Sequence, residues 1–115
     1  MDPEGLARYV LSTYPDLVRS AVIQSFEPAR VRLVFSDGTY MDIRYNERGR
    51  YSYHWQRGEG TEYRFDNAPH HREVTTHPHH LHDSSGNVLP SDVRGVSSHD
   101  VDEVMRLVRA VIGGH

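Results

Sequence analysis

Apolar and polar residues alternate in five consecutive runs of the chain between residues 21 and 66. The runs are AVIQSFE, RVRLVFS, TYMDIRY, RYSYHWQ and TEYRFD, and a turn containing Pro or Gly separates each run from the next. Because successive side chains of a strand point to opposite faces, this period of two is typical of strands with one buried face. The five runs therefore predict an antiparallel meander of about five strands.

The two ends of the chain carry a helical pattern instead. Asp2 and Pro3 form a cap and first-turn pair before apolar residues at helical spacing, which predicts a helix over about residues 3–14. A serine at 97 or 98 can cap a second helix over about residues 98–112. Its apolar face consists of Val101, Val104, Met105, Val108, Val111 and Ile112. The predicted fold is α+β, with both helices packed on one face of the sheet.

Turn lengths decide which residues face one another across the predicted sheet. A three-residue turn at 36–38 pairs Leu33 with Met41 and keeps the apolar side chains on one face. Turns at 46–50 and 57–61 extend the same register to the next strands. The polar face then carries one row of side chains across three strands: Asp42, His54 and Arg64. This row is either the solvated side of a half-buried sheet or part of a functional site.

The composition narrows the classes of protein. The 115 residues fit one domain over residues 1–115. The absence of cysteine excludes disulfides and thiolate metal sites, and it leaves imidazole and carboxylate as metal ligands. No apolar run approaches the roughly 18 residues that span a bilayer, and the N-terminus lacks the pattern of a secretory signal. We therefore expect a cytoplasmic protein without a membrane partner.

Charge gives a weaker indication of the partner. The formal net charge of -3 argues against a strongly basic nucleic-acid binder. All 13 basic side chains are arginine and none is lysine. This bias reflects either genome composition or a use for planar guanidinium groups that suit phosphate.

Histidine is concentrated between the predicted sheet and the second helix. Residues 67–96 show little periodicity and contain six of the nine histidines: His70, His71, His77, His79, His80 and His82. We predict a long His-rich loop there, and loops longer than about 12 to 15 residues are uncommon in compact domains unless they are functional or disordered. One interpretation is scattered surface histidine. The other is a site, in which the segment folds back over the arginine side of the sheet and encloses a polar pocket.

Two kinds of chemistry would use such a cluster. In the first, neutral imidazoles bind a transition metal such as zinc, with His70, His80 and His82 as candidate ligands, although their spacing matches no specific metal signature. In the second, one histidine takes a proton from a ribose 2′-hydroxyl while another donates a proton to the leaving 5′-oxygen. Arg64 then stabilises the charge that develops on the phosphate. The second chemistry needs no cofactor.

Three motifs in the second half of the chain resemble a known family. They are YSYHWQ at 51–56, RFDNAPHH at 64–71 and HPHHLH at 77–82. In this order they resemble the TumE family, toxin partners of TumA antitoxins in prokaryotic two-gene modules, whose pattern is Y-x-Y-H, R-Y-D-N-x-P-H-H and F-P-H-H-x-H. The resemblance covers about residues 30–93. It implies a small cytoplasmic toxin that is inhibited by a cognate antitoxin with a helix-turn-helix domain.

Carried over position by position, the resemblance brings in Tyr53 and a set of polar residues. The candidate site residues are His54, Arg64, Asp66, Asn67, His70, His71, His79, His80 and His82. The chain departs from the pattern at two positions. Phe65 stands where Tyr is usual, which removes a hydroxyl, and His77 stands where Phe is usual, so we assign it no role.

Three hypotheses for function follow. The first is a toxin that acts as a metal-independent ribonuclease, with His54, His70, His80 and His82 as acid and base candidates and Asp66 orienting a histidine. The second is a metal-dependent hydrolase on the same scaffold. The third is a binding module without catalysis, whose His-rich loop becomes ordered on a partner. A homodimer is left open in all three.

Overall fold

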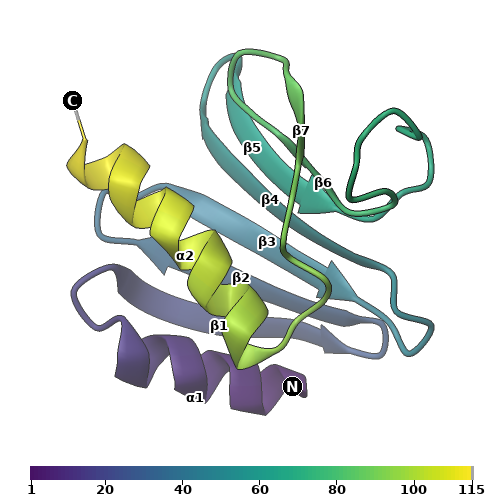
Figure 1. Ribbon diagram of the computed structural model, residues 1–115. Coiled ribbons are helices and arrows are strands. Elements are labelled where there is room, and N and C mark those ends of the chain that lie inside the picture. Colours follow the sequence, from purple (N-terminus) through teal and green to yellow (C-terminus); the bar gives the residue numbers. More distant parts are fainter. Residues whose placement is uncertain (115) are drawn as a thin grey trace.

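The computed structural model describes residues 1–114 and consists of two helices and seven strands (Figure 1). The elements are α1 (Pro3–Thr13), β1 (Val18–Phe26), β2 (Ala29–Phe35), β3 (Tyr40–Tyr45), β4 (Tyr51–Gly58), β5 (Thr61–Asp66), β6 (His80–His82), β7 (Val88–Pro90) and α2 (Ser98–Gly113). The strands form one antiparallel sheet in sequence order, β1 to β7. Within the described residues, neither helix is long and apolar enough to cross a membrane.

The structure confirms the α+β class and the antiparallel meander, but the sheet is larger than predicted. Residues 67–96 are not one long loop, because β6 and β7 lie within them. Each of these strands has three residues, which is too short to give a visible period of two. The first strand also begins at Val18 rather than Ala21. Two register shifts, between Val18 and Ser20 and between Ile23 and Ser25, interrupt the alternation of this strand. The sequence pattern therefore does not show where the strand begins.

The predicted register is confirmed across the central strands. Leu33 pairs with Met41, and the amide of Phe35 donates to the carbonyl of Thr39 across the turn. Gly38 has a φ of 87°, the left-handed conformation that this turn requires. The polar row also forms as predicted: Asp42 pairs with His54, and His54 pairs with Arg64.

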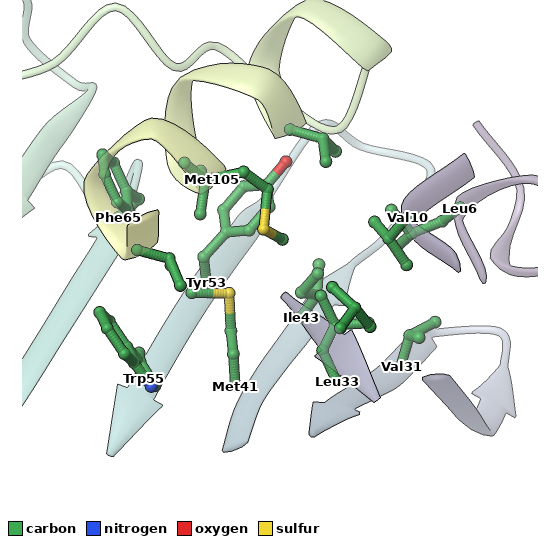
Figure 2. Close-up of a cluster of buried hydrophobic side chains, with 14 of the residues drawn as sticks. Leu6, Val10, Val31, Leu33, Met41, Ile43, Tyr53, Trp55, Phe65 and Met105 are labelled. Carbon is green, nitrogen blue, oxygen red and sulfur yellow. The ribbon is translucent and has the colours of Figure 1, made fainter. Parts of the chain in front are cut away.

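Both helices pack against the apolar face of the sheet. Leu6 and Val10 of α1 belong to the same buried cluster as Met105 of α2, together with Leu33 and Tyr53 of the sheet. Figure 2 shows Met105 above Tyr53, and the two α1 residues at the β2 and β3 side of the cluster. Among residues 1–114 no helix covers the other face of the sheet, and we call it the open face. Burial therefore fixes which side of every strand is available for a site.

The segment 91–97 returns the chain from β7 across the sheet to α2 (Figure 1). Two tyrosine hydroxyls from β4 hold it in place: Tyr51 donates to the carbonyl of Val93 at 2.7 Å, and Tyr53 donates to the carbonyl of Gly95 at 2.7 Å. Ser97 then caps α2 in a reciprocal capping box with Asp100. The two phenol groups thus have a structural role, because they donate hydrogen bonds to backbone carbonyls that would otherwise lack a partner.

A carboxylate joins the two helices. Asp102 of α2 accepts hydrogen bonds from the hydroxyls of Tyr14 at 2.6 Å and Tyr9 at 2.7 Å, both from the α1 end of the chain. These bonds favour the ionised carboxylate, so the pKa of Asp102 is lowered, first by Tyr14 and then by Tyr9.

This pairing predicts a pH-dependent contribution to stability. Since the folded pKa of Asp102 lies below its unfolded value of about 3.9, its contribution is complete above that pH and is lost as the pH falls through the folded pKa. The difference in free energy of unfolding between the wild type and Asp102→Asn should be constant near neutrality and shrink below about pH 4. Urea denaturation across the acid range measures it. The exposed Asp92→Asn is the control, and a difference for Asp102→Asn that persists unchanged into strong acid would contradict the assignment.

Candidate active site

The site begins with a buried carboxylate at the end of β5. Alternation along β5 places Arg64 and Asp66 on the open face, and Asp66 is 7% exposed. Its Oδ1 accepts a hydrogen bond from the amide of Ala68 at 2.9 Å, which tightens the turn after the strand. The Nε of Arg64 lies 3.2 Å from Oδ2, close enough for a charge pair, but its N–H is not aligned as a hydrogen bond. The Asp66 carboxylate therefore has lone pairs left to accept hydrogen bonds from other neighbours.

Strand β6 brings two imidazoles to this carboxylate. In the register of β5 and β6, His80 pairs with Asp66 and His82 pairs with Arg64. The Nε2 of His80 lies 3.1 Å from Asp66 Oδ1, and the Nε2 of His82 lies 3.7 Å from Oδ2. The two Nε2 atoms are themselves 3.1 Å apart. Two imidazoles and a carboxylate thus share one small space, and a proton can pass between them.

The backbone determines the tautomer of His80. Its Nδ1 lies 2.9 Å from the carbonyl of Pro78, and a carbonyl only accepts, so Nδ1 carries a proton. The Nε2 of His80 can therefore accept a hydrogen bond from the Nε2–H of His82 when the ring is neutral, and it can donate to Asp66 Oδ1 when the ring is protonated. The His80 side chain is only 2% exposed, whereas that of His82 is 25% exposed. His80 is the fixed, buried member of the pair, and His82 is the member within reach of a ligand.

A third imidazole, His71, completes the cluster from the segment after β5. Its ring centroid lies 4.8 Å from that of His80 and 5.2 Å from that of His82. Its Nδ1 lies 3.3 Å from a carboxylate oxygen of Glu73. One nitrogen from each of the three rings lies within 4.8 Å of the others, so the set could hold a transition metal. The sequence had suggested His70 as the third candidate ligand, but the structure brings His71 to this position.

These side chains surround a cavity of about 370 Å³ on the open face. Its lining consists of Arg50, Ser52, Arg64, Asp66, Ala68, His70, His71, His80 and His82. Burial lowers the pKa of His82, the positive charge of Arg64 lowers it further, and the charge of Asp66 opposes both. A neutral imidazole and a guanidinium therefore face the same space. Such a pair can remove a proton from a bound hydroxyl and stabilise an anion beside it.

Three predicted site residues lie outside this cavity. His54 is aligned with Arg64 on the open face, but its Nε2 is bound to Glu62 at 2.9 Å. His79 points toward the core side, where its ring stacks on Tyr51 with centroids 5.8 Å apart. Alternation explains this, because His79 precedes His80 and faces the opposite way.

The third, Asn67, ties two segments together. Its Oδ1 accepts from the amide of Tyr51 at 3.1 Å, and its Nδ2 donates to the carbonyl of Gly49 at 2.8 Å. Asn67 thus joins the end of β5 to the turn before β4. That turn carries Arg50, so Asn67 is a positioning residue of the cavity wall.

Three lining residues were absent from the candidates: the polar Arg50 and Ser52, and Ala68. The register that follows from the predicted turn at 57–61 also sets Ser52 beside Asp66, because this pair lies two residues along each strand from His54 and Arg64, and the structure confirms the pair. Its small hydroxyl gave no chemical signal by itself. Arg50 lies in a turn, and no periodic pattern shows which face a turn residue will line.

Comparison with known proteins identifies the family to which the chain belongs. The family profile described as "Toxin TumE" matches residues 6–113, nearly the whole chain. The chain belongs to the TumE toxin family. Membership implies a toxin role and an antitoxin partner. Among curated proteins and among solved structures, no match to this TumE family member is found.

The bridging role of Asn67 in this TumE protein can be tested by stability. Asn67→Ala leaves the amide of Tyr51 without its acceptor, which should cost about 1–3 kcal/mol in free energy of unfolding. Asn67→Asp keeps that acceptor and should lose less. Chemical denaturation measures both, with the exposed Asn87→Ala as a control expected to change stability by no more than about 0.5 kcal/mol. Equal effects for Asn67→Ala and Asn87→Ala would show that the bridge contributes nothing.

Proposed function

We propose that this TumE toxin is a metal-independent ribonuclease whose imidazole cavity cleaves RNA phosphodiesters. The observation that supports the proposal is the arrangement of the cluster: two partly exposed imidazoles, His71 and His82, and the Arg64 guanidinium line one cavity, while His80 and Asp66 lie buried behind them. This supplies a base, an acid and a cation around one space, as transfer of a phosphoryl group from a 5′-oxygen to a 2′-oxygen requires.

In the proposed reaction the neutral His82 takes the proton of the ribose 2′-hydroxyl. The 2′-oxygen then bonds to phosphorus, and the bond from phosphorus to the 5′-oxygen breaks. His71 donates a proton to the departing 5′-oxygen, and the products are a 2′,3′-cyclic phosphate and a 5′-hydroxyl. Arg64 stabilises the additional negative charge on the phosphoryl oxygens while both P–O bonds are partly formed. Protons and electrons balance without a cofactor.

His80 and Asp66 serve as positioning residues in this scheme. The 3.1 Å contact between the Nε2 atoms of His80 and His82 fixes the ring of His82. When His82 has taken a proton, the Asp66 carboxylate 3.7 Å from its Nε2 stabilises the imidazolium. His70 lies at the exposed rim of the cavity, where it is available to contact a bound nucleotide.

A metal-dependent hydrolase is the second candidate, favoured by the convergence of His71, His80 and His82. A divalent transition metal held by three imidazoles would leave a position for water, the arrangement of hydrolytic zinc sites. In that case the same imidazoles are ligands rather than acids and bases. The two candidates make opposite predictions about chelation.

Mutation tests the chemistry directly. His82→Ala and Arg64→Ala should each lower the rate of RNA cleavage by about 10² to 10⁴-fold and abolish growth arrest in cells lacking antitoxin. The exposed His99→Ala is the matched control and should remain toxic. Full toxicity of both cavity variants would refute the assigned roles. Growth arrest by the wild type with cellular RNA intact on a gel would instead identify a binding module without catalysis.

Chelation separates the two candidate chemistries. Untagged protein dialysed against a chelator should keep its cleavage rate if the reaction is metal-independent, and elemental analysis should find no stoichiometric zinc, nickel or manganese. Loss of the rate on chelation, with recovery when one metal is added back, would replace the acid–base scheme by the metal-dependent one.

We further propose that the toxin acts in the cytoplasm and that its antitoxin carries a helix-turn-helix domain. A small helix-turn-helix gene beside the toxin gene would support this pairing. The mass of the complex purified with that antitoxin would give the number of toxin copies, including the homodimer that the sequence left open.

A further inference from the structure

Two arginines lie directly opposite each other on the open face. In the register of β2 and β3, Arg30 pairs with Arg44. Like charges directly opposite each other across two strands destabilise the pairing. Over residues 1–114 neither guanidinium takes part in an ion pair, and the Nε of Arg30 is buried without a hydrogen-bond acceptor. A buried charged donor without an acceptor is costly unless a ligand satisfies it.

The neighbouring carboxylate does not neutralise this pair. Asp42, one row along the strands, accepts two hydrogen bonds from Arg32, at 2.8 and 3.0 Å. Arg32 is the main cause of the lowered pKa of Asp42, and the charges of Arg44 and Arg30 add to it at longer range. Three guanidinium groups, those of Arg30, Arg32 and Arg44, thus surround the single carboxylate of Asp42. Positive charge is therefore in excess on this part of the open face.

The arginine pair is connected to the imidazole cavity by the strand register. Arg44 pairs with Ser52, and Ser52 pairs with Asp66, so one row crosses the sheet from β2 to the site. A second cavity of about 340 Å³ is lined by Arg44 and Arg50. It shares Arg50 and Ser52 with the imidazole cavity. Arg50 and Ser52 therefore form the wall that the two cavities have in common.

We propose that Arg30, Arg44 and Arg50 form a binding site for an RNA phosphate adjacent to the one that is cleaved, so that the RNA crosses the strands from β2 toward β6. The proposal rests on the proposed ribonuclease function and deepens it. Arginine presents planar, paired N–H donors that match phosphate oxygens. A single-stranded RNA supplies consecutive phosphates along such a row, and binding one there offsets the repulsion between the paired arginines.

The test compares RNA ligands of two lengths that cannot be cleaved. A labelled 2′-O-methyl dinucleotide, with one phosphate, and a hexanucleotide are titrated with wild type and with the double variant Arg30→Gln/Arg44→Gln, using fluorescence anisotropy at several salt concentrations. The wild type should bind the hexanucleotide more tightly than the dinucleotide. The double variant should lose at least about tenfold in affinity for the hexanucleotide but little for the dinucleotide. The slope of log affinity against log salt concentration should become shallower by about 0.7, the value for the loss of one phosphate contact to a single strand.

The matched control is Arg8→Gln/Arg106→Gln, which removes the same charge from the exposed surfaces of the two helices. It should keep both the affinity and the preference for length. The melting temperature of Arg30→Gln/Arg44→Gln should not fall below that of the wild type, because the substitutions remove a repulsion. If the two arginines instead stabilised the fold, the melting temperature of the variant would fall.

Several outcomes would overturn the proposal. An unchanged preference for the hexanucleotide in Arg30→Gln/Arg44→Gln refutes it even if the wild type cleaves RNA. Loss of antitoxin binding with RNA binding intact assigns this surface to the antitoxin and also refutes it. Failure of the ribonuclease assignment has a separate signature, because the arginine variant would then alter RNA binding as expected while His82→Ala leaves toxicity unchanged.

Discussion

The candidate site depends on one buried carboxylate. Asp66 cannot remain ionised and buried without partners, because an unpaired charge in the interior is strongly unfavourable. Its partners come from three places along the chain: Arg64 two residues earlier, the amide of Ala68 in the next turn, and the imidazoles of β6. The contacts of the Asp66 carboxylate therefore determine where β5 ends and which way the next turn runs. They also determine how β6 pairs with β5. The same contacts that stabilise the fold here arrange the groups proposed to react.

The meander gives this arrangement a simple geometry. Because every strand pairs with its neighbour in sequence order, positions on the open face line up in rows that run across the sheet. One row contains Arg32, Asp42, His54, Arg64 and His82, and its charges compensate one another for most of its length. The adjacent row contains Arg30, Arg44, Ser52, Asp66 and His80, and its charges are separated, basic at β2 and β3 and acidic at β5. Within residues 1–114, Arg30 and Arg44 of the second row take part in no ion pair, whereas Asp66 of the same row contacts Arg64 and His82 of the first row. The imidazole cavity therefore draws its groups from both rows.

Much of this could be predicted from the sequence, for identifiable reasons. Alternation fixed the faces of β2 to β5, and turn length then determined the pairing of Leu33 with Met41 and of His54 with Arg64. The same parity pairs Arg30 with Arg44, so the arginine row was also accessible to sequence reasoning. The His-rich segment was not, because strands of three residues carry no measurable period and depend on tertiary contacts. The choice of His71 over His70 likewise depends on turns whose conformation the residue types alone do not determine.

The position of β6 in the sheet has a consequence for how the toxin could be controlled. α1 packs on β1 and β2 at one edge of the sheet, whereas β6 and β7, of three residues each, lie at the other edge. Marginal edge strands of this kind open locally at lower free energy than the core to which they are attached. Of the cavity residues, His80 and His82 lie on β6. Local opening at this edge would separate their imidazoles from Asp66 while the helices and the longer strands stay folded.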